Sequence, residues 1–111
     1  MASARVWSVT SATPTEEDAR NIARTVVAER LAAGAEVTGP ATSVFWHNDE
    51  LGEGLEWRVT LKTSAAARDR LADRILELHP WADGSEIVAF PVEWAIDRYT
   101  EWVEKFTTAA E

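Results

Sequence analysis

The apolar residues at the start of the chain change from an extended to a helical spacing. Residues 5–12 place Val6, Trp7 and Val9 among serines and threonines, which predicts a first strand. The next four residues, Thr-Pro-Thr-Glu, predict a helix start with Thr13 as the N-cap and a capping-box glutamate. Beyond them, apolar side chains recur at helical spacing, at Ala19, Ile22, Ala23, Val26, Val27 and Leu31. We therefore expect an amphipathic helix that ends at Gly34.

The middle of the chain alternates apolar and polar residues with the period of a β-strand. Two extended runs between Ala35 and Thr63 flank a polar segment, residues 47–50, which predicts a hairpin turn. In the second run one face is apolar, with Leu55, Trp57, Val59 and Leu61, and the other polar, with Glu56, Arg58, Thr60 and Lys62. In the first run Gly39-Pro40 predicts a kink or an edge strand, because proline cannot donate to the ladder.

The last part of the chain predicts a helix, a strand and a further helix. Ser64 is the expected cap of a helix with an apolar stripe, which the His79-Pro80 step ends. Residues 86–92 are apolar at nearly every position, so both faces of that strand should be covered. A short amphipathic helix is expected to follow, with its apolar residues at Trp94, Ile96, Tyr99, Trp102, Val103 and Phe106.

The order of these elements predicts the fold class. Strand, helix, strand, strand, helix, strand is the ferredoxin-like split βαβ arrangement, an α+β sandwich, here followed by a C-terminal helix. We expect one domain over residues 1–111. Because both crossover helices cover the same face of such a sheet, the other face needs a second subunit or a ligand. A trimer or dimer is therefore expected.

Composition narrows the possible partners and chemistry. The 111 residues carry a formal net charge of −8, which disfavours nucleic acid and anionic membranes as partners. The chain has no cysteine, so thiolate metal sites, disulfides and thiol nucleophiles are excluded. It lacks a long apolar run and a signal-peptide pattern, from which we expect a cytoplasmic location. Six tryptophans are many for this length, which predicts aromatic contacts between subunits.

Short sequence pieces from Ser8 to about Phe106 resemble one known family in their order and spacing. The pieces are Ala28-Glu29-Arg30-Leu31-Ala32-Ala33, Thr42-Ser43-Val44-Phe45-Trp46, Glu56 with Leu61-Lys62-Thr63, Leu78-His79-Pro80-Trp81, Glu86-Ile87, Pro91-Val92 and Tyr99-x-x-Trp102. Together they resemble the CutA family, small proteins associated with tolerance of divalent cations such as copper. The resemblance implies a homotrimer of ferredoxin-like subunits with clefts between them.

The sequence departs from that family at positions that bear on metal binding. Gly34 stands where many members have the cysteine proposed to bind copper, and residues 47–49 replace the usual Trp-Glu-Gly turn. The loop at residues 82–85 is one residue longer than usual and lacks its proline, which predicts a reshaped cleft loop. Without a thiolate we expect no tight Cu(I) binding. Weak Cu(II) or Zn(II) binding is expected through His79 and Glu86.

Each candidate site residue also has a structural interpretation. His79 can cap the second helix instead of binding a metal. Glu56 and Lys62 share the face of their strand that points away from the helices. There they can form a polar network between packed sheets or line a cleft for a small ligand. The aromatic candidates for that cleft are Trp46, Trp81, Tyr99 and Trp102, for which packing at subunit contacts is the favoured interpretation because aromatic burial stabilises oligomers.

The sequence therefore predicts a binding protein and no enzyme. Neither a nucleophile elbow nor a glycine-rich phosphate loop is present, since Ala12-Thr13-Pro14-Thr15 follows the first strand. We expect a CutA-like homotrimer that binds a divalent metal ion or a small ligand at intersubunit clefts. Two alternatives stay open: a trimeric small-molecule sensor like the PII proteins, and a small ferredoxin-like enzyme. A phosphate loop would favour the sensor, and a pocket with convergent carboxylates would favour the enzyme.

Overall fold

The computed structural model describes residues 3–81 and 86–107 and contains the predicted succession of elements. Their bounds are β1 (Val6–Thr13), α1 (Glu16–Ala28), β2 (Gly34–His47), β3 (Glu50–Ser64), α2 (Arg68–Leu78), β4 (Ile87–Val92) and α3 (Asp97–Phe106). The βαββαβ order with a C-terminal helix confirms the predicted ferredoxin-like α+β class. The reshaped loop expected at residues 82–85 lies outside the described residues.

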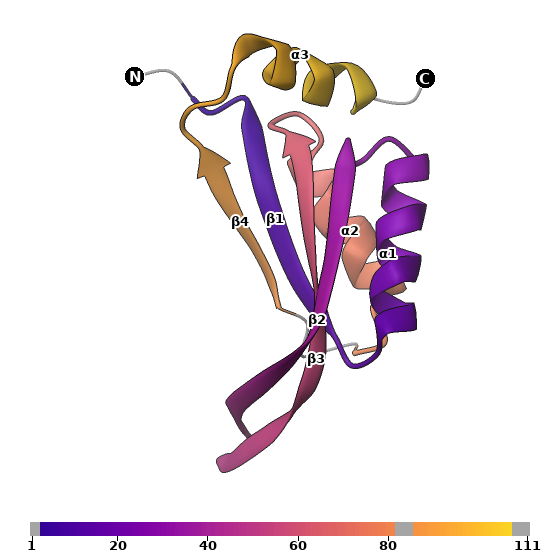
Figure 1. Cartoon of the computed structure of the whole chain (residues 1–111), viewed down its shortest axis with the longest axis vertical. Helices are drawn as coiled ribbons and strands as arrows, with labels where there is room; N and C mark the ends of the chain where they lie inside the picture. Colours follow the sequence, from indigo (N-terminus) through magenta and orange to yellow (C-terminus); the bar gives the residue numbers. More distant parts are fainter. Residues whose placement is uncertain (1–2, 82–85, 108–111) are drawn as a thin grey trace.

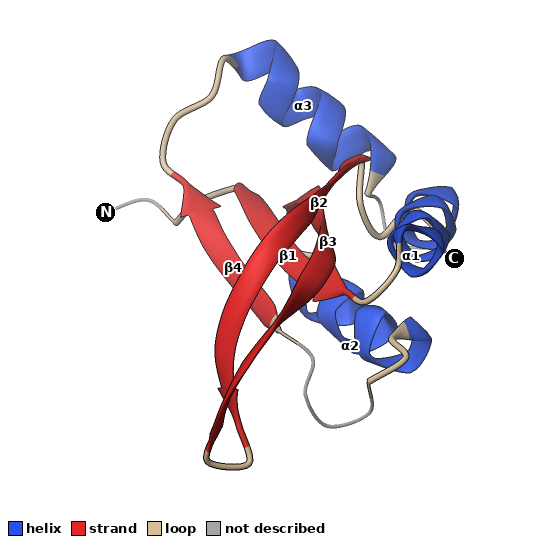
Figure 2. Cartoon of the chain, turned by 60° about the horizontal axis from the view of Figure 1, so that its bottom comes forward, coloured by secondary structure: helices blue, strands red, loops and turns tan. Residues whose placement is uncertain are grey.

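The strands form one antiparallel sheet in the order β2-β3-β1-β4. Helices α1 and α2 pack side by side on one face of this sheet, as Figure 2 shows. Helix α3 lies across one end of the molecule, and the β2–β3 hairpin extends past the other end (Figure 1). Among the described residues, no helix is both long enough and apolar enough to cross a membrane.

The core lies between the sheet and the two crossover helices. Its fully buried members include Val9, Val59 and Leu61 from the sheet, with Ile22 and Val26 from α1 and Leu71 and Ile75 from α2. Each such side chain contributes roughly 1.5–3 kcal/mol by leaving water. The predicted alternation of β3 is thus confirmed at Val59 and Leu61, which point to the helices.

The alternation fails at Leu55, whose side chain is 59% exposed. The pairing of β1 with β3 stops at Thr13 opposite Trp57, so residues of β3 before Trp57 pair only with β2. This two-stranded extension, residues 41–56, is called the arm below. Its tip is a tight turn at Asn48 and Asp49, which both adopt positive φ. The predicted hairpin turn is confirmed, and the arm has no helix against either face.

The expectations for Gly39-Pro40 are both confirmed. β2 is an edge strand of the sheet, and its register with β3 shifts between Thr38 and Ala41. Proline is tolerated there because an edge strand does not need every N–H for the ladder. The break separates the part of β2 that covers the core from the part that forms the arm.

Both ends of the first helix differ from the prediction. The N-cap is Thr15, whose hydroxyl oxygen accepts a hydrogen bond from the Asp18 amide at 3.1 Å. Thr13 instead belongs to β1, because pairing with β3 continues through it. The helix ends at Ala28, and Gly34 opens β2 opposite Lys62.

The close of α1 explains why Gly34 is not its last residue. The Leu31 amide donates to the Val26 carbonyl at 2.9 Å and the Arg30 amide donates to the Val27 carbonyl at 3.0 Å. This is the Schellman pattern, in which the residue at C′ adopts a left-handed conformation. Arg30 fills that place with φ of 63°, at a cost of about 1–2 kcal/mol for a residue with a Cβ.

The second helix begins later than the sequence indicates. Its N-cap is Ala67, without a side-chain cap, and Ser64 ends β3. The Ser64 hydroxyl accepts from the Ala67 amide at 3.3 Å and from the Thr107 hydroxyl at 2.8 Å. The serine therefore closes the turn before α2 and helps attach the chain after α3. The helix ends at Leu78, directly before His79, as predicted.

Helix α3 is fixed to the face of the sheet opposite α1 and α2. Val103 is fully buried in a small second cluster with Val6, Ala33, Val92 and Tyr99. Arg5 and Glu104 add a bidentate ion pair at 2.7 and 3.0 Å, which lowers the pKa of Glu104. Because this pair is solvent-exposed, packing contributes more than the charges to holding α3.

Replacing Thr15 by alanine tests the corrected helix start. The variant loses the hydroxyl that caps the Asp18 amide, so the free energy of unfolding should fall by about 1 kcal/mol in urea titrations. Thr15→Ser keeps the accepting oxygen, so its free energy of unfolding should stay within about a few tenths of a kcal/mol of the parent value. Equal losses in the two variants would show that the methyl group matters and the cap does not.

Candidate functional site

The face of the sheet opposite α1 and α2 holds the candidate site. We call it the open face and define it by the alternate residues that do not point into the core: Ser8, Thr10, Glu36, Thr38, Glu56, Arg58, Thr60, Lys62, Val88 and Phe90. α3 covers only one end of it. The face carries polar groups in its middle and exposed apolar side chains on β4, where Val88 is 40% and Phe90 55% exposed.

In a single subunit only one face of β4 is covered. Ile87 and Ala89 pack against the core, as a strand with two covered faces requires. Val88 and Phe90, on the other face, are exposed and are not covered by any element that the structure describes. The apolar sequence of β4 therefore identifies a surface that one subunit by itself leaves in water.

Strand register fixes the neighbours of Lys62. It lies between Ser8 of β1 and Gly34 of β2, and Phe90 of β4 lies beyond Ser8 in the same row. Its side chain is half-buried. Within the described part of the chain, no carboxylate forms an ion pair with its ammonium group. Glu56 and Lys62 therefore do not pair with each other within the subunit, and the network expected between packed sheets stays a prediction.

The partner of Glu56 is Arg58, which the sequence analysis did not select. The guanidinium of Arg58 contacts the Glu56 carboxylate at 2.6 Å and the Glu86 carboxylate at 2.5 Å. The bond to Glu86, and then that to Glu56, raise the pKa of Arg58, although partial burial of the guanidinium acts in the opposite direction. One cation between two anions leaves the group with a net negative charge. The position of Arg58 two residues after Glu56, on the same face of the strand, was the sequence signal that could have identified it as a partner.

A second group lies at the α3 end of the open face. Partial burial of the phenol and the negative charge of Glu36 both raise the pKa of Tyr99. The rings of Tyr99 and Trp102 pack with centroids 5.6 Å apart. Trp102 also covers Gly34 closely: a Cβ added at residue 34 would lie 3.3 Å from the Trp102 ring. The space beside residue 34 is therefore filled by an aromatic ring.

Both ring nitrogens of His79 are already engaged. Nε2 lies 2.7 Å from the Ala12 carbonyl, and Nδ1 accepts from the Trp81 amide at 3.1 Å. These partners require a neutral ring with its proton on Nε2. The ring thus joins the end of α2 to β1, and it does not bond the last helix carbonyls. Glu86, the second predicted metal ligand, is bound to Arg58.

The residues of one subunit do not fit a closed metal site. Among the described residues, no three side chains of the types His, Cys, Asp or Glu lie close enough to hold one ion together. A structural zinc site usually needs four such ligands. Any ion held by His79 or Glu86 would have to displace bonds that these groups already make.

The four aromatic candidates are only partly brought together. Tyr99 and Trp102 share α3, and Trp81 packs near His79 with ring centroids 5.4 Å apart. Trp46 pairs with Leu51 beside the turn at the tip of the arm and is 75% exposed. The arm lies at the end of the molecule opposite α3 (Figure 1). Because Trp46 lies on the arm and Trp102 on α3, at opposite ends of a molecule 44 Å long, one subunit does not bring them into a single cleft.

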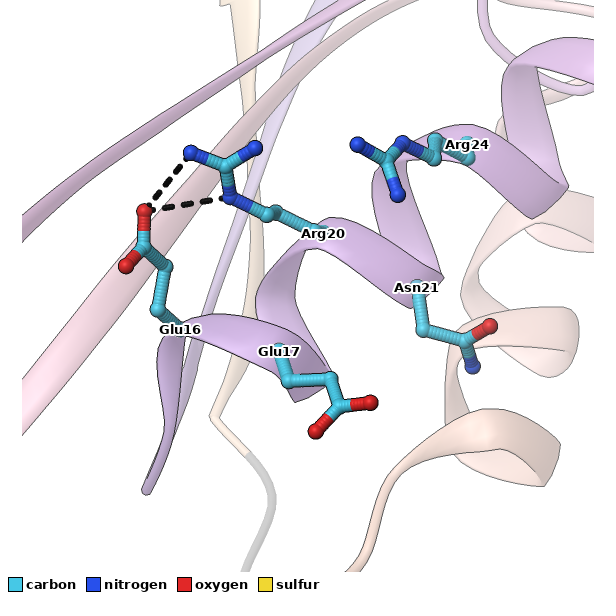
Figure 3. Close-up of a pocket in the computed structure, with 5 residues that line it drawn as sticks. All are labelled: Glu16, Glu17, Arg20, Asn21 and Arg24. Atoms are coloured by element: carbon cyan, nitrogen blue, oxygen red, sulfur yellow. Dashed lines mark hydrogen bonds and ion pairs between the residues drawn. The ribbon is translucent and has the colours of Figure 1, made fainter.

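A solvent-filled depression of about 300 Å³ lies on α1, and it is not a binding site. It is lined by Glu16, Glu17, Arg20, Asn21 and Arg24, all from this one helix (Figure 3). Arg20 and Glu16 pair at 2.8 Å as i,i+4 neighbours. With charged side chains of both signs and no opposing element, this surface is an ordinary solvated helix face.

Comparison with known proteins decides the family. Residues 7–106 match the family described as CutA1 divalent ion tolerance protein. The chain belongs to the CutA family. It is 36% identical to the divalent-cation tolerance protein CutA of Thermus thermophilus, over 85% of this chain and 90% of that protein. It is 33% identical to the human protein CutA over 85% of this chain, but spans only 52% of that longer relative.

Solved CutA structures share the whole architecture. The Thermus thermophilus protein matches with a TM-score of 0.88 and 34% identity, over 92% of this chain and 98% of that one. CutA1 of Ehrlichia chaffeensis matches with a TM-score of 0.88 and 28% identity, over 95% and 97%. A CutA described as periplasmic, from Archaeoglobus fulgidus, shares the fold at 22% identity. The predicted CutA resemblance is confirmed, and the cytoplasmic location stays a prediction.

Titration of Tyr99 tests the geometry at the α3 end. It is the only tyrosine in the chain, so ultraviolet absorbance of the phenolate reports on it alone. Its midpoint should lie above that of an exposed tyrosine, about 10. Glu36→Gln should lower that midpoint, while Glu53→Gln, on the arm, should not. An unchanged titration midpoint in Glu36→Gln would show that the charge of Glu36 does not act on Tyr99.

The same shift sets a pH dependence of stability. The pKa of Tyr99 is raised in the folded chain. The contribution of Tyr99 to the free energy of unfolding is therefore complete below its pKa in the unfolded chain, and it is lost as the pH rises through its pKa in the folded chain. Unfolding at pH values on either side of about 10 should show this loss in the parent chain. The loss should be smaller in Glu36→Gln.

Proposed function

We propose that this CutA protein acts as a homotrimer in divalent-metal tolerance, with a small ligand or metal ion bound in clefts between its subunits. The observation that carries the proposal is the open face. It combines exposed apolar residues with a half-buried ionic group, a composition that a lone subunit leaves in water. Burying that face against copies of itself would cover it, and closed symmetric assemblies are the usual solution.

The arm supports self-assembly independently. It carries five exposed large apolar residues: Val44, Phe45, Trp46, Leu51 and Leu55. A two-stranded ribbon with both faces in water is marginal on its own. Its edges and faces are suited to packing against another subunit, where the aromatic side chains would be buried.

The proposed cleft contains groups that are set for recognition but not for catalysis. Lys62 offers a cation without an ion-pair partner in the described residues, and Arg58 holds Glu56 in a fixed orientation. We place Glu56, Lys62, Tyr99 and Trp102 in the cleft of one subunit, with Trp46 and Trp81 contributed across the contact. A small polar ligand with an anionic group would match Lys62. None of the described groups favours the PII-like sensor or an enzyme over this function.

We propose that divalent-ion binding is weak and uses His79 and Glu86. Nδ1 of His79 must lose the Trp81 amide before it can bind an ion, and Glu86 must leave Arg58. Both exchanges oppose binding. The family's association with divalent ions supports an ion in the assembly, and the absence of cysteine argues for Cu(II) or Zn(II) over Cu(I).

The assembly is tested by placing a charge on the open face. Phe90→Lys removes an apolar contact worth roughly 2 kcal/mol and forces an ammonium into the interface. Association should weaken by more than about tenfold, seen as a lower mass in sedimentation or native mass spectrometry. Leu76→Lys is the matched control, because Leu76 is 49% exposed on α2, outside the open face. A parent chain that is monomeric at micromolar concentration would contradict the proposal directly.

Metal binding is tested by calorimetric titration of the trimer with Zn(II) and Cu(II). Glu86→Gln removes one proposed ligand and should weaken the binding by about tenfold. Glu93→Gln changes the charge equally and should leave it unaltered. His79→Ala is less decisive alone, because it also removes a buried hydrogen bond to β1. Binding that is indifferent to Glu86→Gln would place the ligands elsewhere.

A further inference from the structure

A groove of about 370 Å³ lies between the C-terminal ends of α1 and α3. Its lining includes Ala28, Arg30, Ala32, Ala33, Trp102 and Phe106. Figure 1 shows these two helix ends meeting beside the end of the sheet. The groove has the size of a small-molecule site and is mostly apolar. Glu56, Arg58, Lys62 and Glu86 do not line it, so it is separate from the ionic group of the open face.

One cation stands at this apolar groove. Arg30 places its guanidinium carbon 5.7 Å from the centre of the Phe106 ring. In the described residues no carboxylate forms an ion pair with Arg30, although the chain has 19 acidic residues and only 11 lysines and arginines. Its neighbour Glu29 is held by Arg74, with two hydrogen bonds of 2.9 Å each. The fork of the guanidinium therefore keeps its donors available.

The backbone at Arg30 carries strain that its structural role does not require. The residue has φ of 63° at the C′ position of α1, where glycine would form the same helix end without a Cβ penalty. Strained non-glycine residues are found where the side chain itself is needed. A cation there also offsets the negative end of α1, but that end amounts to only about half a charge. Part of the positive charge is left for a ligand.

We propose that this groove binds a small aromatic carboxylate. The aryl ring would lie against Trp102 and Phe106, whose rings are tilted by 57° with centroids 6.2 Å apart. The carboxylate would accept two hydrogen bonds from Arg30, the bidentate geometry that guanidinium groups favour. Lys105, 5.4 Å from the centre of the Phe106 ring, adds to the positive potential. Ala28, Ala32 and Ala33 line the groove with small side chains, which leave room for the ring.

The test compares a charged and a neutral probe on the assembled full-length protein. Phenylacetate and phenylacetamide share the ring, and only the first is an anion. By calorimetry in the millimolar range, phenylacetate should bind about tenfold more tightly, as one charge-assisted contact allows. Arg30→Gly should lower the affinity for phenylacetate to that for phenylacetamide. The same variant should raise the melting temperature, because glycine relieves the positive φ.

Two further variants separate the groove from general effects of charge. Arg24→Ala removes an exposed arginine from the same helix and should leave phenylacetate binding unchanged. Ala28→Leu fills the groove without altering any charge and should weaken both probes. Equal binding of the two probes, no saturable binding of phenylacetate, or wild-type affinity in Arg30→Gly would each overturn the proposal. So would a change of subunit number in Arg30→Gly, because the groove would then be a contact between copies.

Discussion

A β-sheet has two faces, and two crossover helices can cover only one of them. In this chain α1 and α2 cover the face that carries Val9, Val59 and Leu61. Because side chains alternate along a strand, every residue that is directed into that core forces its neighbours onto the other face. The open face, with its ionic group and its apolar edge, follows from this geometric constraint.

The polar groups of the open face are arranged by register and not by closeness in sequence. Arg58 reaches Glu86 because β1 lies between their strands and brings the start of β4 beside the middle of β3. The cost of burying such charges is offset only when each has a partner. Arg58 has two, and Lys62 has none in the described part of the chain. This asymmetry is the reason to place a ligand or a second subunit near Lys62.

Helix α3 has two roles, and Trp102 takes part in both. Val103 and Tyr99 cover one end of the open face, where Trp102 belongs to the proposed cleft, and Trp102 also forms a wall of the groove beside α1 together with Phe106. Trp102 also takes the space beside residue 34, so the glycine and the tryptophan are matched.

The sequence by itself determined the order of the elements, the ferredoxin-like class, the core face of β3 and the family. These follow from local periodicity and short motifs, which depend only on neighbouring residues. The ends of α1 were less predictable. Thr13 and Gly34 are residue types that often begin and end a helix, but both pair with β3 and therefore belong to strands. Only the tertiary structure decided which charges meet, that both nitrogens of His79 are engaged, and that Arg30 stands at an apolar groove. These contacts join segments far apart in the chain, and their distances depend on how the whole sheet twists and packs.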